Sequence, residues 1–171
     1  MQGRITVRPR LPADMDACVS VLRQVHEHDR YPLVWPADPA AWLSGSRQLA
    51  AWVACTERGI CGHVALARPR PGEAATAWAA HLQAEPDTLL CVSVLFVAPL
   101  ARGSGAGGRM LDTALAGARA RGGAAVLEVV TLNPQAIALY RAKGWRPIGS
   151  VRYNWLPPGE ESLLFISPDH G

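Results

Sequence analysis

The sequence is poor in several residue types whose abundance would indicate a class of protein. Charged residues make up 18% of the 171 residues and aromatic residues 6%, and Lys143 is the only lysine among 17 basic residues. The formal net charge is only +3, and the arginines are scattered rather than clustered. This excludes the strongly basic composition that is typical of nucleic-acid-binding proteins, so we expect no nucleic-acid partner.

Long apolar runs are also lacking. No stretch reaches the ~18 apolar residues that a membrane-spanning helix requires, and residues 1–10 lack the apolar core of a signal peptide. We therefore expect a cytoplasmic protein with no membrane partner. The scarcity of lysine beside abundant arginine, alanine, glycine and proline is typical of a GC-rich bacterial genome.

The cysteines form no C-x-x-C pair and lie in apolar stretches. They are Cys18, Cys55, Cys61 and Cys91. We expect reduced thiols in the core rather than disulfides or metal ligands. The polar run His26 to Asp29 is a conceivable metal site, but adjacent residues on a helix point in different directions, so a solvated helix end is the preferred interpretation. No metal is expected.

Hydrophobic periodicity predicts an α/β chain that forms a single domain over residues 1–171. Strands are expected at residues 5–8, 49–56, 62–67, 89–97, 125–131, 147–155 and 162–166, the last two forming a closing hairpin. Helices are expected at residues 14–28, 39–43, 105–121 and 133–144. A further short helix fits residues 73–84, but the sequence does not indicate the role of the segment 68–87.

The most informative stretch is residues 94–108, in which an apolar strand, a proline turn and a glycine-rich loop lead into an amphipathic helix. The start of a helix presents N–H groups without intrahelical partners and the positive end of the helix dipole. Four glycines within residues 103–108 let the backbone approach a phosphate closely, and Arg102 adds a positive charge. The pattern predicts an anion site.

Two common phosphate-binding motifs fit this loop poorly. The nucleoside-triphosphate P-loop would place Arg109 and Met110 where a lysine and a hydroxyl are required. The dinucleotide fingerprint G-x-G-x-x-G matches from Gly103, but Pro99 and its neighbours separate the glycines from the strand. In addition, Glu128 lies inside its strand rather than at the end where a ribose-binding acid is required.

A third pattern, [RQ]-x-x-G-x-[GA], fits at Arg102, Gly105 and Gly107. Together with Val97-Ala98-Pro99 before it and the segment Asn133 to Trp145 after it, the stretch resembles the GCN5-related N-acetyltransferase (GNAT) family. The resemblance extends over residues 5–166. It implies an α/β (α+β) GNAT fold, in which a mixed sheet of about six to seven strands is splayed around an acyl-CoA site and flanked by about four helices.

The resemblance implies acetyl-CoA as co-substrate, with the length of the acyl group left open. The pantetheine arm would pair with the exposed edge of the strand at residues 95–97, and the pyrophosphate would meet the amides of residues 103–108. The implied cofactor-binding residues are Leu95, Phe96, Val97, Arg102, Gly103, Ser104, Gly105, Ala106, Gly107, Gly108, Asn133 and Tyr140.

Acetyl transfer from a thioester to an amine requires a neutral nucleophile, a stabilised oxyanion and a proton for the thiolate. Tyr140 matches the tyrosine that protonates the thiolate in this family, and the backbone N–H near Leu95 matches the oxyanion donor. Asn133 could bind pantetheine, cap its helix, or both. Leu127-Glu128-Val129 resembles a subgroup that includes ribosomal-protein N-terminal acetyltransferases, in which this Glu is a base through water. A structural or charge-pairing role for Glu128 stays open.

The acceptor is the least determined part. Tyr31 and Trp35, in an aromatic loop after the first helix, are candidate acceptor contacts, although packing or a dimer interface fits them equally well. The implied function is acetylation of a primary amine, on a small molecule or a peptide N-terminus, by direct attack in a ternary complex. The alternative is a non-catalytic acyl-CoA-binding module, which would need neither Tyr140 nor Glu128. A homodimer is compatible with the family.

Overall fold

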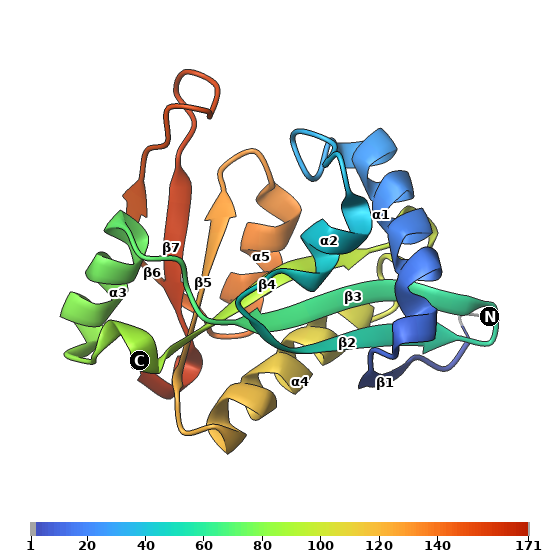
Figure 1. Ribbon diagram of the computed structural model, residues 1–171, viewed down its shortest axis with the longest axis horizontal. Coiled ribbons are helices and arrows are strands. Elements are labelled where there is room, and N and C mark those ends of the chain that lie inside the picture. The colour runs from blue at the N-terminus through green and yellow to red at the C-terminus, as the bar shows by residue number, and fades with distance from the viewer. Residues whose placement is uncertain (1–2, 171) are drawn as a thin grey trace. The chain divides into compact units, whose positions relative to one another are not determined.

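The computed structural model describes residues 3–170, which form both helices and strands (Figure 1). Within these residues the strands are β1 (Thr6–Pro9), β2 (Gln48–Thr56), β3 (Gly59–Ala67), β4 (Leu89–Val97), β5 (Ala124–Val130), β6 (Arg146–Val151) and β7 (Ser162–Ile166). The α-helices are α1 (Met15–Asp29), α2 (Pro39–Ser44), α3 (Glu73–Leu82), α4 (Ala106–Ala120) and α5 (Pro134–Ala142). Most predicted elements are confirmed to within two or three residues.

The seven strands hydrogen-bond in the order β1-β2-β3-β4-β5-β7-β6. β4 and β5 are parallel, with Leu89 opposite Ala124 and Cys91 opposite Val126. The pairs β1–β2, β5–β7 and β6–β7 are antiparallel. A parallel pair requires a crossover connection, and the chain between β4 and β5 forms α4. The predicted mixed sheet is confirmed, and α3 is the further short helix that fits residues 73–84.

The chain forms two compact units, and both β4 and α4 contribute to each. The first unit contains the described residues up to Leu66 together with Val94–Ala114. The second contains Ala67–Ser93 and the described residues from Leu115 onward. Every predicted site residue therefore belongs to one unit or the other, and a single domain stays a prediction.

In the first unit, α1 crosses in front of β2 and β3 in the view of Figure 1. The apolar side chains of α1 recur at helical spacing, and Leu22 and Val25 are buried as that pattern predicts. Met110 of α4 is also buried. At Gly62 in β3, a Cβ would lie 2.7 Å from Cε of Met110 and 3.0 Å from the carbonyl oxygen of Phe96. A larger residue would require Met110 and the Phe96 backbone to shift, so glycine suits this close approach of β3 to its neighbours.

In the second unit, α3 packs on β6 and β7 (Figure 1). Trp78 of α3 is 1% exposed and is the largest side chain in a buried apolar cluster. The other members of the cluster are Ala74, Ala79, Leu89, Val126, Val151, Leu164 and Ile166. The segment 68–87, whose role the sequence did not indicate, thus supplies the helix that covers this part of the sheet.

The predicted extent of the closing hairpin is wrong. β6 ends at Val151, which pairs with Ser162, rather than continuing to Trp155. The chain beyond Val151 has to turn back within ten residues, and the prolines at 157 and 158 have no N–H to donate to a strand ladder. Tyr153 and Trp155 are therefore loop residues.

The cysteines of the described chain carry free thiols, as predicted. Cys18 and Cys61 are buried, whereas Cys55 and Cys91 are half-buried. Burial raises the pKa of Cys18 to about 11. A thiol with such a pKa stays protonated at neutral pH and is a poor nucleophile.

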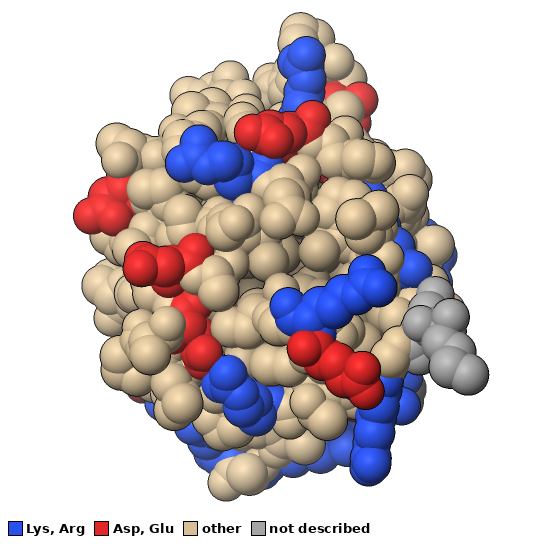
Figure 2. All heavy atoms as spheres, turned by 90° about the vertical axis from the view of Figure 1, so that its right-hand side faces the viewer, with Lys and Arg blue, Asp and Glu red and all other residues tan. Residues whose placement is uncertain are grey.

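The face shown in Figure 2 carries blue basic and red acidic side chains beside one another, among uncharged atoms. This mixture agrees with the low net charge. Across residues 3–170, the helices are too short or too polar to cross a membrane.

Candidate active site

The glycine-rich loop precedes α4 as predicted. Gly103 and Gly105 have φ values of 75° and 84°. Side chains with a Cβ rarely adopt this left-handed region, so the loop conformation requires glycine at both positions. α4 begins at Ala106, which places its first N–H groups directly after the loop. The sequence therefore builds the helix start that an anion needs.

The amides of the loop differ in their availability. Helix geometry gives the N–H groups of Gly107 and Gly108 no intrahelical acceptor. The Ser104 amide donates to the carbonyl of Ala101 at 3.4 Å, and the Ala106 amide donates to Oγ of Ser104 at 3.3 Å. Both bonds are long, so a phosphate oxygen that approaches these two amides can replace them at low cost.

Arg102 is held by a partner that the sequence did not indicate. Its guanidinium donates to both carboxylate oxygens of Asp29, with 3.1 Å between Nη1 and Oδ1. The hydrogen bond from Arg102 is the main cause that lowers the pKa of Asp29. Asp29 ends α1, where a solvated helix end was expected. Asp29 is exposed, as that interpretation requires, and its carboxylate in addition forms a bidentate ion pair with the loop.

The other polar residues at this end of α1 also have protein partners. Nδ1 of His26 lies 2.7 Å from the carbonyl oxygen of Pro32, and Nδ1 of His28 lies 2.7 Å from Oδ1 of Asp29. Among the described residues, His, Cys, Asp and Glu side chains form no group of three that could hold a metal ion.

The second half of β4 contains an irregular backbone. Val94 has a φ of 51°, which is left-handed and unusual for a β-branched residue inside a strand. Phe96 is 4% exposed, whereas Leu95 and Val97 are half-buried. Side chains alternate across a strand, so Phe96 faces the interior of this unit and its two neighbours face the other side.

The aromatic loop after α1 is packed onto its own unit. Tyr31 contacts Trp42 edge-on with 6.2 Å between ring centroids. Trp35 lies 5.3 Å from the His26 ring, and the Arg23 guanidinium lies 4.8 Å from the Trp35 centroid. The two candidate acceptor residues thus have separate neighbours, and acceptor contact by either stays a prediction.

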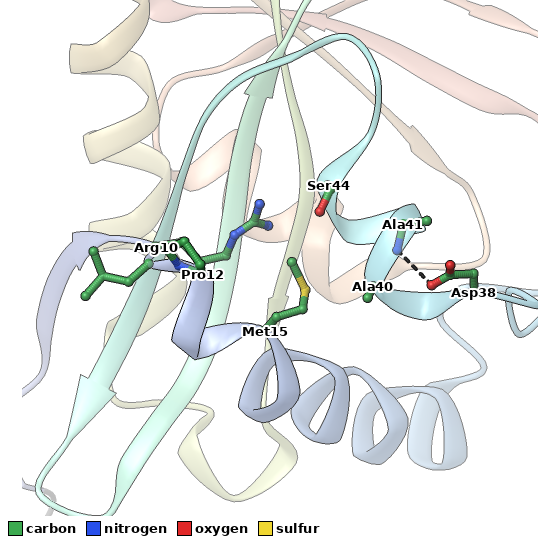
Figure 3. A pocket seen from close by; sticks show the side chains of 8 residues that line it. Arg10, Pro12, Met15, Asp38, Ala40, Ala41 and Ser44 are labelled. Carbon is green, nitrogen blue, oxygen red and sulfur yellow. Dashed lines mark hydrogen bonds between the residues drawn. The ribbon is translucent and has the colours of Figure 1, made fainter.

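A hollow of about 490 Å³ lies between the start of α1 and α2 (Figure 3). Arg10, Pro12 and Met15 line one side, and α2 lines the other with Ala41 and Ser44. The Asp38 carboxylate in its lining caps α2 by accepting from the Ala41 amide at 3.0 Å. None of the predicted site residues lines it.

Glu128 is the central residue of the predicted site in the second unit. It lies inside β5 between buried neighbours, as the sequence suggests, but its own side chain is exposed. Its Oε2 accepts hydrogen bonds from Oη of Tyr153 and Oγ of Ser162, both at 2.9 Å. Solvent and two hydroxyl donors stabilise the carboxylate, so the cost of burying a charge does not arise.

Tyr153, which donates to this carboxylate, and Trp155, which stacks on Tyr153, were missed in the sequence. Their rings are stacked with 5.3 Å between centroids and an interplanar angle of 15°. Trp155 is 60% exposed. Burial, followed by the charge of Glu128, raises the pKa of Tyr153. The two aromatic residues are visible in the sequence of the closing hairpin. They were missed because the strand was predicted to continue to residue 155, whereas the chain turns after Val151 and brings Tyr153 to Glu128.

Tyr140 lies on α5 and is 6% exposed, with its ring edge-on to Phe165 at 5.9 Å. Asn133 caps this helix, since its Oδ1 accepts from the Ala136 amide at 3.2 Å. The predicted capping role of Asn133 is confirmed. Its binding of pantetheine and the acid role of Tyr140 stay predictions.

The predicted residues 95–108 form one continuous stretch of the first unit. In the first unit, an irregular strand edge leads into a glycine loop with an arginine, which suits a long anionic cofactor. In the second unit, the Glu128 carboxylate accepts from Tyr153, whose ring stacks on Trp155. The mixed seven-stranded sheet and the match to an acetyltransferase family define the protein as an acetyltransferase enzyme.

The chain belongs to the GNAT family. The sequence profile of the Acetyltransferase (GNAT) family matches residues 16–145, which include the loop, Glu128 and Tyr140. The suspected family, fold class and enzyme class are therefore confirmed. A comparison with curated proteins found no significant match.

Solved structures with this fold include several N-acetyltransferases. The ribosomal-protein-S18-alanine N-acetyltransferase of Escherichia coli has a TM-score of 0.69 and 19% identity, over 96% of this chain and 94% of that chain. A GCN5-related N-acetyltransferase from Kribbella flavida has a TM-score of 0.68 and 22% identity, over 96% and 97%. NAA60 of Arabidopsis thaliana in complex with acetyl-CoA has a TM-score of 0.70 and 19% identity, over 95% and 98%. At these identities the similarity shows the fold alone.

Proposed function

We propose that the protein is an acetyl-CoA-dependent N-acetyltransferase that transfers the acetyl group directly to a primary amine. The amine belongs to a small molecule or a peptide N-terminus. The observation that carries the proposal is the continuous stretch from Val94 to Gly108. There an irregular strand edge, two left-handed glycines and a helix start follow one another. Membership of the GNAT family supports the cofactor, as does the acetyl-CoA complex of the NAA60 structure.

This stretch offers a matching partner for each part of the cofactor. The backbone of residues 95–97 pairs with the amide groups of pantetheine. The amides of Gly107 and Gly108 bind the pyrophosphate at the positive end of α4. Arg102 is already beside this loop and adds a fixed charge.

The chemistry divides among three groups. The amine nitrogen attacks the thioester carbon, and the carbonyl oxygen becomes an oxyanion that the Leu95 N–H stabilises. As the C–S bond breaks, the phenol of Tyr140 donates a proton to the CoA thiolate. The amine proton passes to the Glu128 carboxylate through a water molecule, or Glu128 pairs with the positive charge of the acceptor.

The exposed aromatic pair favours a cationic acceptor near Glu128. The face of an indole ring attracts an ammonium group, and an adjacent carboxylate adds a full opposite charge. Tyr153 and Ser162 hold the carboxylate in place by donating to Oε2. An amine that enters beside Trp155 therefore meets a preorganised anion.

The first experiment is a thermal-shift titration with acetyl-CoA and free CoA, with ATP and NADH as controls. A ligand that binds only the folded state raises the melting temperature, so a rise specific to the CoA species supports the cofactor assignment. A rise with NADH or ATP instead would contradict it. Amines are then screened for release of the CoA thiol. Binding without thiol release for any amine would favour the non-catalytic acyl-CoA-binding module.

Two glycine variants test the loop directly. Gly105→Ala forces a Cβ into a left-handed position, and we expect it to weaken acetyl-CoA affinity about tenfold, by about 1–2 kcal/mol. Gly59→Ala is the matched control, because Gly59 also has a positive φ, 115°, but is the first residue of β3, far along the chain from the loop. It should lose comparable stability and keep its affinity for acetyl-CoA.

A further inference from the structure

The left-handed residue Val94 needs an explanation, because nothing local favours it. A β-branched side chain is strained at a φ of 51°, and such strain persists only where the surroundings impose it. Val94 lies immediately before Leu95, whose amide is the proposed oxyanion donor. The groups that impose this conformation therefore bear on catalysis.

His63 of β3 is the side chain that contacts this backbone. Its ring is 0% exposed, and Nδ1 lies 2.9 Å from the carbonyl oxygen of Val94. The ring also stacks on Phe96, with 5.3 Å between centroids and an interplanar angle of 14°. His63 thus contacts β4 on both sides of Leu95.

The partners of His63 determine where its proton lies. Nε2 lies 2.8 Å from Nη1 of Arg10, and a guanidinium can only donate, so Nε2 has to accept. The Val94 carbonyl can only accept, so Nδ1 has to carry the hydrogen. Only the neutral Nδ1–H tautomer satisfies both contacts. Burial of the ring lowers the pKa of His63 to about 4, which keeps this form at neutral pH.

Arg10 is itself fixed. Its Nη1 donates to the carbonyl oxygen of Leu43 at 3.1 Å, and its Nη2 donates to Oε1 of Gln48 at 2.8 Å. Gln48 also donates to the Leu43 carbonyl, at 2.7 Å. Figure 3 shows the Arg10 side chain reaching along the hollow toward Ser44. The end of β1, the end of α2 and the start of β2 therefore hold the guanidinium that orients His63.

Because the peptide unit is planar, the direction of the Val94 carbonyl also fixes the direction of the Leu95 N–H. In a trans peptide the C=O of one residue and the N–H of the next lie in one plane and point in opposite directions. Because His63 holds the Val94 oxygen toward β3, the Leu95 N–H points away from β3, toward the opposite edge of β4. A rotated peptide would break the bond to His63 and turn the N–H away from that edge.

We propose that His63 is a positioning residue for acetyl transfer. Through Nδ1–H it fixes the Val94–Leu95 peptide so that the Leu95 N–H points at the carbonyl oxygen of the thioester. His63 does not touch the substrate, and it acts only through this peptide. The proposal rests on the proposed function, because it requires a thioester beside β4.

The test compares the affinities of acetyl-CoA and S-ethyl-CoA by calorimetry. The two ligands differ by the carbonyl oxygen that the Leu95 N–H would bind. The wild-type protein should prefer acetyl-CoA by about three- to tenfold, the size of one hydrogen bond. His63→Phe keeps a ring on Phe96 but removes the donor. It should bind both ligands within twofold of each other, with unchanged affinity for S-ethyl-CoA. His63→Asn, whose amide can donate to Val94, should recover the preference.

The outcomes separate the two proposals. A wild-type protein that binds neither ligand would overturn the proposed function, and the His63 proposal with it. A wild-type protein that binds both ligands equally would overturn only the His63 proposal, as would a folded His63→Phe variant that keeps the preference or loses affinity for both ligands. If His63→Phe does not fold, nitrogen-15 spectra of the wild-type imidazole decide. An Nδ1–H tautomer supports the proposal and an Nε2–H tautomer overturns it. His81→Phe, which replaces an exposed histidine of α3, is the control variant and should keep the wild-type preference for acetyl-CoA.

Discussion

His63 in the first unit and Glu128 in the second each have two polar partners, but only Glu128 is exposed to solvent. In the first unit, His63 bridges Arg10 and the Val94 carbonyl with its ring fully buried. In the second, Glu128 accepts from Tyr153 and Ser162 with its side chain exposed. A buried group reaches a substrate only through the backbone that it holds, whereas an exposed carboxylate can meet an amine directly.

Strand geometry explains the difference. His63 lies in the part of β3, residues 61–66, that is buried on both faces, and its ring stacks on Phe96. Its ring is therefore enclosed. Glu128 lies between Leu127 and Val129, which are 1% and 7% exposed, and strand alternation turns its side chain to the opposite, solvated face. If the two environments were exchanged, the histidine would be exposed to solvent and the carboxylate would be enclosed, so each would have different chemistry.

The largest expected effect comes from Tyr140. Its side chain is 6% exposed, yet it is proposed to meet the cofactor sulfur directly, so it is an exception to the statement that a buried group acts only through the backbone. Tyr140→Phe removes the proton donor and should lower turnover about 100-fold or more, with affinity for acetyl-CoA changed less than about twofold. Steady-state kinetics and calorimetry measure the two quantities. Unchanged turnover would remove Tyr140 from the mechanism, and it would then no longer be an exception.

The next effect concerns stability. The pKa of His63 is lowered from 6.5 to about 4 by burial, so the unfolded chain binds a proton that the folded protein excludes. The stability conferred by neutral His63 is complete above pH 6.5 and is lost as the pH falls toward 4. The loss amounts to about 3 kcal/mol.

Denaturant unfolding from pH 7 to pH 4 measures this effect. The wild-type protein should lose about 3 kcal/mol more free energy of unfolding than His63→Phe over this range. All other titrating groups are common to both proteins and cancel in the difference. The exposed His81→Phe should retain the wild-type slope. Equal slopes for the wild type and His63→Phe would show that solvent reaches His63.

A smaller effect is expected at Glu128. Glu128→Gln keeps the shape of the side chain but cannot accept a proton, so turnover should fall about tenfold and the acidic limb of the pH–rate profile should move. Because the side chain is exposed, the free energy of unfolding should change by less than about 0.5 kcal/mol. Glu161→Gln is the matched control, since Glu161 also accepts from a serine hydroxyl, that of Ser150. An unmoved acidic limb would count against the base role.

The smallest effect is expected at the ion pair of the cofactor loop. Asp29→Asn removes a negative charge beside Arg102, so affinity for the anionic acetyl-CoA should rise about two- to fivefold at low salt and return toward wild type at high salt. Asp169→Asn is the control, because Asp169 forms a similar pair with Arg119. A fall in affinity would instead show that Asp29 positions Arg102 for the cofactor.

The elements around the site were largely predictable, because their signals are local. The apolar run 89–97 is β4 with the predicted bounds, and Asn133 caps α5 through its own side chain. The glycines at 103 and 105 have the left-handed φ values that glycine favours. Such features depend on a few neighbouring residues, so a sequence shows them directly.

Other features were missed because they depend on the packing of distant segments. The exposure of Glu128 follows from which face of β5 is covered, and Tyr153 reaches it only because β6 ends early at Val151. The segment 68–87 had no readable role, since the burial of Trp78 depends on a sheet formed by later residues. Apolar patterns identify helices and strands but not the surfaces that they will meet.

The sequence by itself determined the strand, the glycine loop and the helix start that identify an acetyltransferase, because local periodicity and backbone freedom decide them. Only the tertiary structure paired Arg102 with Asp29, 73 residues away, and placed His63 against the Val94 carbonyl, 31 residues away. The ring nitrogens of a histidine can donate or accept, and its neighbours choose between these roles. Chain folding supplies those neighbours, so the proposed role of His63 follows from contacts that the linear sequence does not contain.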